Sequence, residues 1–65
     1  MTLAELYDNQ YPNANLIGVY EKDERGNMKP LEVDFADEYL ETHGERVVKD
    51  HYYSMRKNVL VVELI

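Results

Sequence analysis

The first residues of the chain alternate apolar and polar positions with the period of a short amphipathic helix. Leu3 and Leu6 fall on one helical face. Thr2 stands three residues before Glu5, which is the spacing of a capping box, in which each side chain bonds the backbone N–H of the other residue. A short helix is therefore expected at the start of the chain, ending near residues 8–9.

Two extended stretches follow. Residues 16–22 are rich in β-forming residues, and residues 29–33 are a second such stretch. Gly26 or Asn27, between them, can supply the positive φ that a tight turn requires. The pattern predicts a β-hairpin. Because Pro30 has no N–H to donate, its strand is expected at an edge of the sheet, or with the proline facing away from a partner strand.

The helical period returns after this hairpin. Asp34 is typical of a helix N-cap, and Gly44 is typical of a helix end. Between these two residues, Tyr39 and Leu40 fall with Phe35 near one helical face. We expect a second helix here, packed through its aromatic face.

Residues 45–57 fit two patterns. Their apolar residues have helical spacing, with an acidic residue at the front and basic residues at the back, as the helix dipole favours. Against this, Val48 and the adjacent Tyr52 and Tyr53 favour a strand. The strand interpretation makes the following residues a hairpin turn, with Asn58 in the left-handed conformation.

Residues 59–65 are an apolar, β-branched run, which must pair as a strand and be covered, because it would aggregate if exposed. A weak similarity between the two halves of the chain favours an α-β-β-α-β-β order. The sequence thus predicts an α+β fold in one small domain, residues 1–65, with a four-stranded, mostly antiparallel sheet and one or two short helices on one face. The alternative is a ββαβ arrangement with residues 45–57 helical.

Size and composition limit the function. A domain of 65 residues has little room for a deep pocket, so function is expected on its surface. The absence of cysteine excludes disulfides and thiolate metal sites. A homodimer through an edge strand, for which the final strand is one candidate, is the remaining way to stabilise so small a fold. With neither a signal peptide nor a membrane span, we expect a cytoplasmic protein without membrane contact.

The acidic residues are unevenly distributed. The chain has 13 acidic and 7 basic residues, a net charge of −6, which makes nucleic acid an unlikely general partner. Residues 31–45 contain acids and no base. Five of these acids would form a carboxylate stripe along the second helix and beyond its end: Asp34, Asp37, Glu38, Glu41 and Glu45. Such a stripe is most often a solvated face; the alternatives are a surface for a basic partner, a nucleic-acid mimic, and a divalent-cation site.

One region has the opposite character. Residues 46–57 interleave basic and aromatic side chains, which is typical of single-stranded nucleic-acid binding. The candidate surface is Lys49, His51, Tyr53, Arg56 and Lys57. In a strand, Lys49, His51 and Tyr53 would share one face, with Asp50 and Tyr52 on the other. The simpler interpretation is one core tyrosine on an otherwise ordinary polar face.

No pattern of catalytic or ligand-binding residues stands out. His43 and His51 lack the paired spacing of a zinc site, no hydroxyl lies in a nucleophile motif, and the glycines are too far apart for a phosphate loop. We therefore expect no catalytic residue, no cofactor and no metal ion, and predict that the chain is not an enzyme.

Tyrosine is abundant, with six residues, more than so small a core can bury. Exposed tyrosines are typical of protein interfaces. We predict a small acidic protein–protein interaction module, an adaptor, regulator or inhibitor of a basic partner, of the kind common among accessory proteins of bacteria, phages and mobile elements. The alternatives are a single-stranded nucleic-acid-binding protein that uses residues 46–57, and a nucleic-acid mimic that uses the carboxylate stripe.

Overall fold

The computed structural model describes all residues, 1–65, and has the element order α-β-β-α-β-β. The elements are α1 (Leu3–Gln10), β1 (Leu16–Lys22), β2 (Met28–Phe35), α2 (Ala36–His43), β3 (Val48–Ser54) and β4 (Val59–Leu64). This order confirms the predicted α+β fold class. The alternative with residues 45–57 helical is wrong, because β3 occupies most of that stretch.

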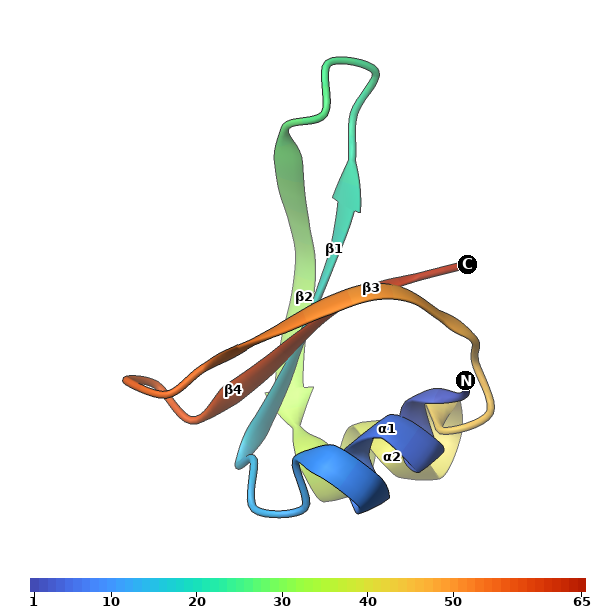
Figure 1. Ribbon diagram of the computed structural model, residues 1–65, viewed down its shortest axis with the longest axis vertical. Coiled ribbons are helices and arrows are strands. Elements are labelled where there is room, and N and C mark those ends of the chain that lie inside the picture. The colour runs from blue at the N-terminus through green and yellow to red at the C-terminus, as the bar shows by residue number, and fades with distance from the viewer.

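The four strands form one mixed sheet in the order β2-β1-β4-β3. Each hairpin is antiparallel, and the hairpins join through β1 and β4, which run parallel at the centre. Figure 1 shows the two hairpins crossing at a steep angle, which reflects the strong twist of the sheet. Since β4 is paired on both sides, the final strand is not an edge. The idea that it offers an edge for dimerisation is therefore wrong.

Both helices lie on the same face of the sheet (Figure 1). They bury a single apolar cluster against the central strands, in which Leu3, Leu6, Ile17, Leu60 and Val62 are fully buried. Side chains of β1 and β4 point to the two faces of the sheet in turn, so every second side chain meets the helices, namely Ile17, Val19, Leu60 and Val62. This side of the sheet is called the helix side below.

The predicted capping box at the start of α1 is present. The N–H of Thr2 donates to Oε1 of Glu5 at 2.9 Å, and the N–H of Glu5 donates to Oγ1 of Thr2 at 3.2 Å. The first turn of α1 also bonds the segment after α2, where the N–H of Ala4 donates to the carbonyl of Gly44 at 2.9 Å. Gly44 ends α2 in a right-handed conformation, and a Cβ there would lie 2.6 Å from the carbonyl oxygen of Leu40. Glycine is therefore required at this position by close packing.

The predicted N-cap of the second helix is wrong. β2 continues through Asp34 and Phe35, which pair with Ile17 and Leu16 of β1. Phe35 takes the N-cap position and makes no side-chain cap bond. Asp34 instead accepts a hydrogen bond from the adjacent N–H of Phe35 at 2.8 Å. Ladder pairing with β1 thus outweighs the local capping preference of Asp34.

Both hairpin turns contain the expected left-handed residue. Gly26 has φ +80° and Asn58 has φ +52°, as the sequence predicts. The side chain of Asn58 accepts a hydrogen bond from the hydroxyl of Tyr53 and donates to the carbonyl of Asn13 at 3.0 Å. Asn58 therefore fixes the β3–β4 turn and connects it to the loop after α1.

Candidate interaction surface

The second face of the sheet is covered by no helix or loop of the chain (Figure 1). Strand register places alternate residues of all four strands on it. We call this surface the uncovered face, and its members are Leu16, Gly18, Tyr20 and Lys22 of β1, Met28, Pro30, Val33 and Phe35 of β2, Asp50, Tyr52 and Ser54 of β3, and Val59, Val61 and Glu63 of β4. The face is mostly apolar.

The sequences of the central strands explain why this face is apolar. In β1, Leu16 and Tyr20 lie on the uncovered face while Ile17 and Val19 lie in the core. The run of β4 is apolar on both faces in the same way. Strands with continuous apolar runs are usually covered on both sides, whereas strands with one solvated face alternate. The central strands thus have the pattern of strands buried on both faces.

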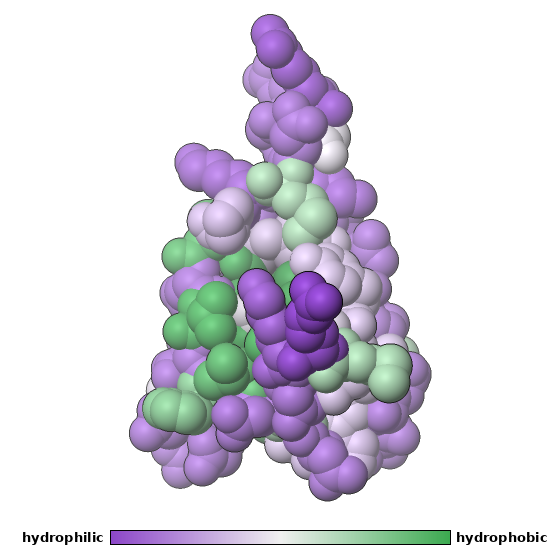
Figure 2. Space-filling model, turned by 90° about the vertical axis from the view of Figure 1, so that its left-hand side faces the viewer, coloured by the Kyte–Doolittle hydropathy of each residue, from purple (hydrophilic) through white to green (hydrophobic).

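Several large side chains of the uncovered face are open to solvent. Val33 is 63% exposed, Phe35 55%, Tyr52 47% and Met28 47%. Figure 2 shows the hydrophobic surface gathered on one side of the molecule, beside the hydrophilic tip of the β3–β4 turn. Scattered apolar side chains are normal on a protein surface, but a contiguous patch is typical of a binding surface.

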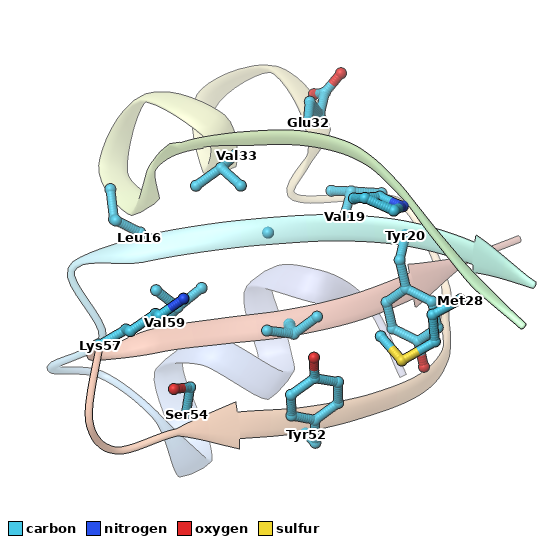
Figure 3. A pocket seen from close by; sticks show the side chains of 13 residues that line it. Leu16, Val19, Tyr20, Met28, Glu32, Val33, Tyr52, Ser54, Lys57 and Val59 are labelled. Carbon is cyan, nitrogen blue, oxygen red and sulfur yellow. The ribbon is translucent and has the colours of Figure 1, made fainter.

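A groove of about 820 Å³ runs over the uncovered face. Figure 3 shows Val33 of β2 and Tyr52 of β3 pointing into this groove from opposite edges of the sheet, while Glu32 points away. Gly18 lies on its floor, where an added Cβ would be 3.6 Å from Val33 and Val59. The absence of a side chain at Gly18 contributes to the depth of the groove.

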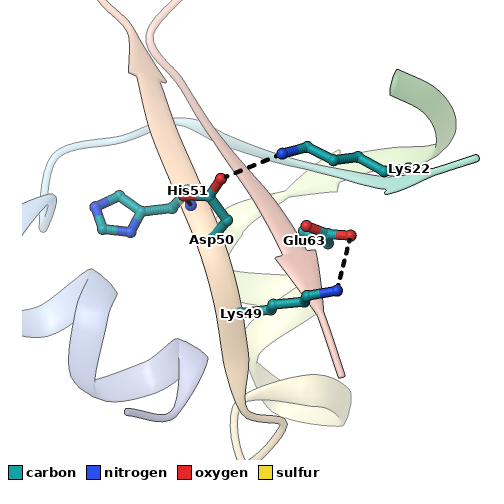
Figure 4. Close-up of polar contacts among 5 residues, drawn as sticks. All are labelled: Lys22, Lys49, Asp50, His51 and Glu63. Atoms are coloured by element: carbon teal, nitrogen blue, oxygen red, sulfur yellow. Dashed lines mark hydrogen bonds and ion pairs between the residues drawn. The ribbon is translucent and has the colours of Figure 1, made fainter. Parts of the chain in front are cut away.

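Two ion pairs border one end of the uncovered face (Figure 4). Nζ of Lys22 lies 3.7 Å from Asp50, and Nζ of Lys49 lies 3.8 Å from Glu63. The Glu63 side chain is almost fully buried beneath its lysine, at 8% exposure. An apolar centre with a charged rim is the usual anatomy of a protein interface.

Two buried tyrosines, Tyr20 and Tyr39, are held in the neutral form. Burial, and then the Asp50 and Glu63 carboxylates, raise the pKa of Tyr20 above its ordinary value. Burial, and then the Glu32 carboxylate, raise the pKa of Tyr39. Both hydroxyls therefore stay protonated at neutral pH, which suits hydrogen-bond donation rather than nucleophilic or basic chemistry.

The carboxylate stripe is shorter than the sequence predicts. Asp37, Glu38 and Glu41 are exposed on α2, but Asp34 belongs to β2 and Glu45 follows the end of the helix. Asp34 pairs with core-facing Ile17, so it lies on the helix side. No group of three or more His, Asp or Glu side chains is arranged to hold a metal ion. The stripe is thus an acidic surface on the helix side, away from the uncovered face.

The predicted basic and aromatic surface is divided by the structure. Tyr53 stacks on Tyr11 with ring centroids 5.2 Å apart, and His51 meets Tyr11 edge-on at 5.7 Å. These two side chains of β3 are on one face, as predicted, with Asp50 and Tyr52 on the other. Their aromatic surfaces are already used in contacts with the loop after α1.

Lys49 does not share a face with His51 and Tyr53, and that prediction is wrong. The register of β3 shifts between Val48 and Asp50, and such a bulge interrupts the alternation of side chains. Lys49 consequently turns to the other side and pairs with Glu63 (Figure 4).

The remaining two basic residues lie in the β3–β4 turn. Arg56 and Lys57 are exposed, and Lys57 lines one end of the groove over the uncovered face (Figure 3). The five predicted residues therefore do not form one surface. What the prediction missed is the uncovered face itself, whose signal in the sequence is the doubly apolar pattern of β1 and β4.

Neither helix is long and apolar enough to cross a membrane. Comparisons with known protein families, with curated proteins and with solved structures gave no match to this chain. The geometry of the uncovered face is therefore the main guide to function.

Proposed function

We propose that this chain is a non-enzymatic protein–protein interaction module that docks through its uncovered face. The observation that carries the proposal is the apolar sheet face, which its own helices leave open although β1 and β4 have the pattern of doubly covered strands. Each Å² of apolar surface removed from water contributes about 25 cal/mol. A covering partner would therefore gain substantial free energy at this face.

The size of the patch suits a macromolecule. An aromatic side chain has a surface on the order of 150–250 Å². Phe35 and Tyr52, each about half exposed, thus present on the order of 200 Å² of mainly apolar surface, and Val33 and Met28, which are exposed to a similar extent, enlarge the patch. A stable protein interface covers about 800 Å² per partner, including a polar rim. The patch and the two ion pairs at its border together fit that anatomy.

The acidic helix side gives the module its second property. Asp37, Glu38 and Glu41 are exposed there and form no ion pair. Such a surface attracts a basic protein and accelerates its association. An adaptor, regulator or inhibitor of a basic partner is the form of this function that the charge supports, and the absence of cysteine is compatible with work in a reducing cytoplasm.

The two alternatives gain no support from the geometry. Nucleic-acid bases stack on free aromatic rings, whereas Tyr53 is stacked on Tyr11 and Lys49 is paired with Glu63, which leaves Tyr52 as the exposed aromatic ring of residues 46–57. A nucleic-acid mimic would need regularly spaced carboxylates, but Asp34 and Glu45 lie outside α2.

The test is binding by two matched variants. Val33 lies on the uncovered face and is 63% exposed; Val47 precedes β3, bridges to Thr2 and does not line the groove, and is 44% exposed. Tagged wild type, Val33→Glu and Val47→Glu would be compared for proteins retained from a native lysate and for self-association. We expect Val33→Glu to lose binding and Val47→Glu to keep it. Equal binding by all three proteins would contradict docking through this face.

A further inference from the structure

We infer that the partner on the uncovered face is a second copy of this chain, so that two sheets pack face to face into a sandwich. This inference rests on the proposed function, and it names the partner that occupies the uncovered face. Two sheets packed in this way lie about 10 Å apart and interdigitate the side chains of their inner faces. Each copy would then cover the open face of β1 and β4 in the other copy.

The small core is the first argument for a second copy. Only 14 of 65 residues are buried, and a single core in a chain of this length rarely supplies more than about 3–5 kcal/mol. There is no cysteine, and no cluster of three or more His, Asp or Glu side chains could hold a metal. Oligomerisation is another common means of stabilising so small a fold. A second copy is also present wherever the chain is synthesised, so it can always cover the exposed patch.

The two edges of the sheet argue for face packing rather than strand pairing. β2 has Pro30, which cannot donate to a new strand, and an irregular register with β1 near Tyr20. β3 has a bulge at Lys49. Proline, bulges and lysine on edge strands are the devices that prevent edge-to-edge association. A dimer of this chain is thus directed to the uncovered face, not to the edge strands that the sequence favoured.

The charge distribution is the third argument. A net charge of −6 opposes self-association unless the acids lie away from the interface. The elements of the helix side contribute nine acids and two bases, namely Glu5, Asp8, Glu21, Glu32, Asp34, Asp37, Glu38, Glu41 and Glu45 against Lys29 and Arg46. The uncovered face and its rim contribute three lysines and two acids, namely Lys22, Lys49 and Lys57 against Asp50 and Glu63.

In a face-to-face sandwich both acidic helix sides point outward. They are separated by two sheets, and the sheet spacing alone is about 10 Å. This exceeds the Debye length of about 8 Å at physiological ionic strength. The repulsion between the two chains would therefore be largely screened, while the near-neutral apolar faces meet.

Sedimentation equilibrium over a range of concentrations tests this inference with full-length wild type, Val33→Glu and Val47→Glu. We expect wild type and Val47→Glu to show twice the 7.7 kDa mass of one chain. We expect Val33→Glu to fold, as judged by circular dichroism, because Val33 is already 63% exposed. Its dissociation constant should rise at least about a hundredfold, since a twofold interface contains each substitution twice. If Val33→Glu does not fold, Tyr52→Lys on the opposite edge strand repeats the test.

The outcomes separate the two proposals. A wild-type protein that stays monomeric at every concentration overturns the second copy as occupant. In that case, capture of another protein that Val33→Glu alone loses would keep the proposed function, and equal capture by all variants would overturn it as well. A dimer that both Val33→Glu and Tyr52→Lys leave intact overturns face packing and indicates association elsewhere on the molecule.

Discussion

On the central strands β1 and β4, the two faces of the sheet are similarly apolar and differ in their cover. On the helix side, Ile17, Leu60 and Val62 are fully buried beneath α1 and α2. On the uncovered face, Tyr20 and Val59 of the central strands are shielded by their neighbours, at 4% and 7% exposure, but Val33 and Phe35 of the edge strand β2 are more than half exposed although they are equally apolar. The comparison teaches that the central strands fit a sheet with two covers, of which this chain supplies one. The following predictions test the difference between the faces.

The largest difference is expected from truncating one side chain on each face. Leu60→Ala leaves a cavity beneath the helices and should lower the free energy of unfolding by about 2–5 kcal/mol, which is enough to unfold most of the protein. Val33→Ala should change that free energy by less than about 0.5 kcal/mol in the monomer, because its side chain is exposed. Urea denaturation at low protein concentration measures both. Equal losses of unfolding free energy in the two variants would contradict the difference in burial between Leu60 and Val33.

Removal of Leu64 and Ile65 tests how far the covered side extends along the chain. Leu64 packs against the core cluster, and the N–H of Ile65 donates to the carbonyl of Val47 at 3.0 Å. We expect the deletion to lower the free energy of unfolding by about 2–3 kcal/mol, mainly through lost apolar burial. Thermal unfolding compared with the point variant Ile65→Ser isolates the part due to Leu64. Full stability after the deletion would refute the role assigned to the end of β4.

Two glycines offer the same substitution on the two sides. Gly44→Ala should cost about 1–3 kcal/mol, because its Cβ would lie 2.6 Å from the backbone oxygen of Leu40. Gly18→Ala should be tolerated, because its Cβ would lie 3.6 Å from Val33 and Val59, and alanine restricts the unfolded chain more than glycine does. Chemical denaturation of the two variants gives the comparison. A larger loss for Gly18→Ala would contradict the open floor of the groove.

The smallest effect is expected from a substitution in the capping box of α1, one of the two helices that cover the helix side. Hydrogen bonds from the backbone and then the side chain of Thr2 hold the pKa of Glu5 below its ordinary value of 4.5. The ionised carboxylate therefore contributes stability above pH 4.5, and this contribution is lost as the pH falls through the lower folded-state pKa. Melting temperature against pH should fall less steeply on the acid side for Glu5→Gln. If the melting temperature of Glu5→Gln falls with acid as steeply as that of wild type, the bonds between Thr2 and Glu5 do not contribute to the pH dependence of stability.

Local structure was predictable where neighbours in sequence decide it. The capping box of Thr2 and Glu5 and the left-handed Asn58 follow from short-range chemistry. The failure of Asp34 to act as an N-cap was not predictable, because strand pairing with β1, which is distant in sequence, competes with capping. Lys49 was placed on the wrong face because the alternation of side chains along a strand does not reveal a bulge.

Sheet order and the uncovered face were beyond the prediction for a related reason. Periodicity identifies strands but not their neighbours, so the parallel pairing of β1 with β4 had no local signal. The apolar runs at residues 16–20 and 59–62, within β1 and β4, did contain one clue, since central strands covered on both faces have such runs. With this interpretation, the two runs predict that β1 and β4 are the central strands and indicate that both faces of the sheet need to be covered.

The most direct test of the central claim is nuclear Overhauser contact between two copies in a sample that mixes isotope-labelled and unlabelled chains. Face-to-face packing predicts contacts between copies at the methyl groups of Val33 and Val61 and at the ring of Tyr52, and none at Val47. Val33, Val61 and Tyr52 lie on the uncovered face, whereas Val47 precedes β3 and bridges to Thr2. The absence of contacts at Val33, Val61 and Tyr52, or contacts confined to the backbone edges of β2 and β3, would contradict the account.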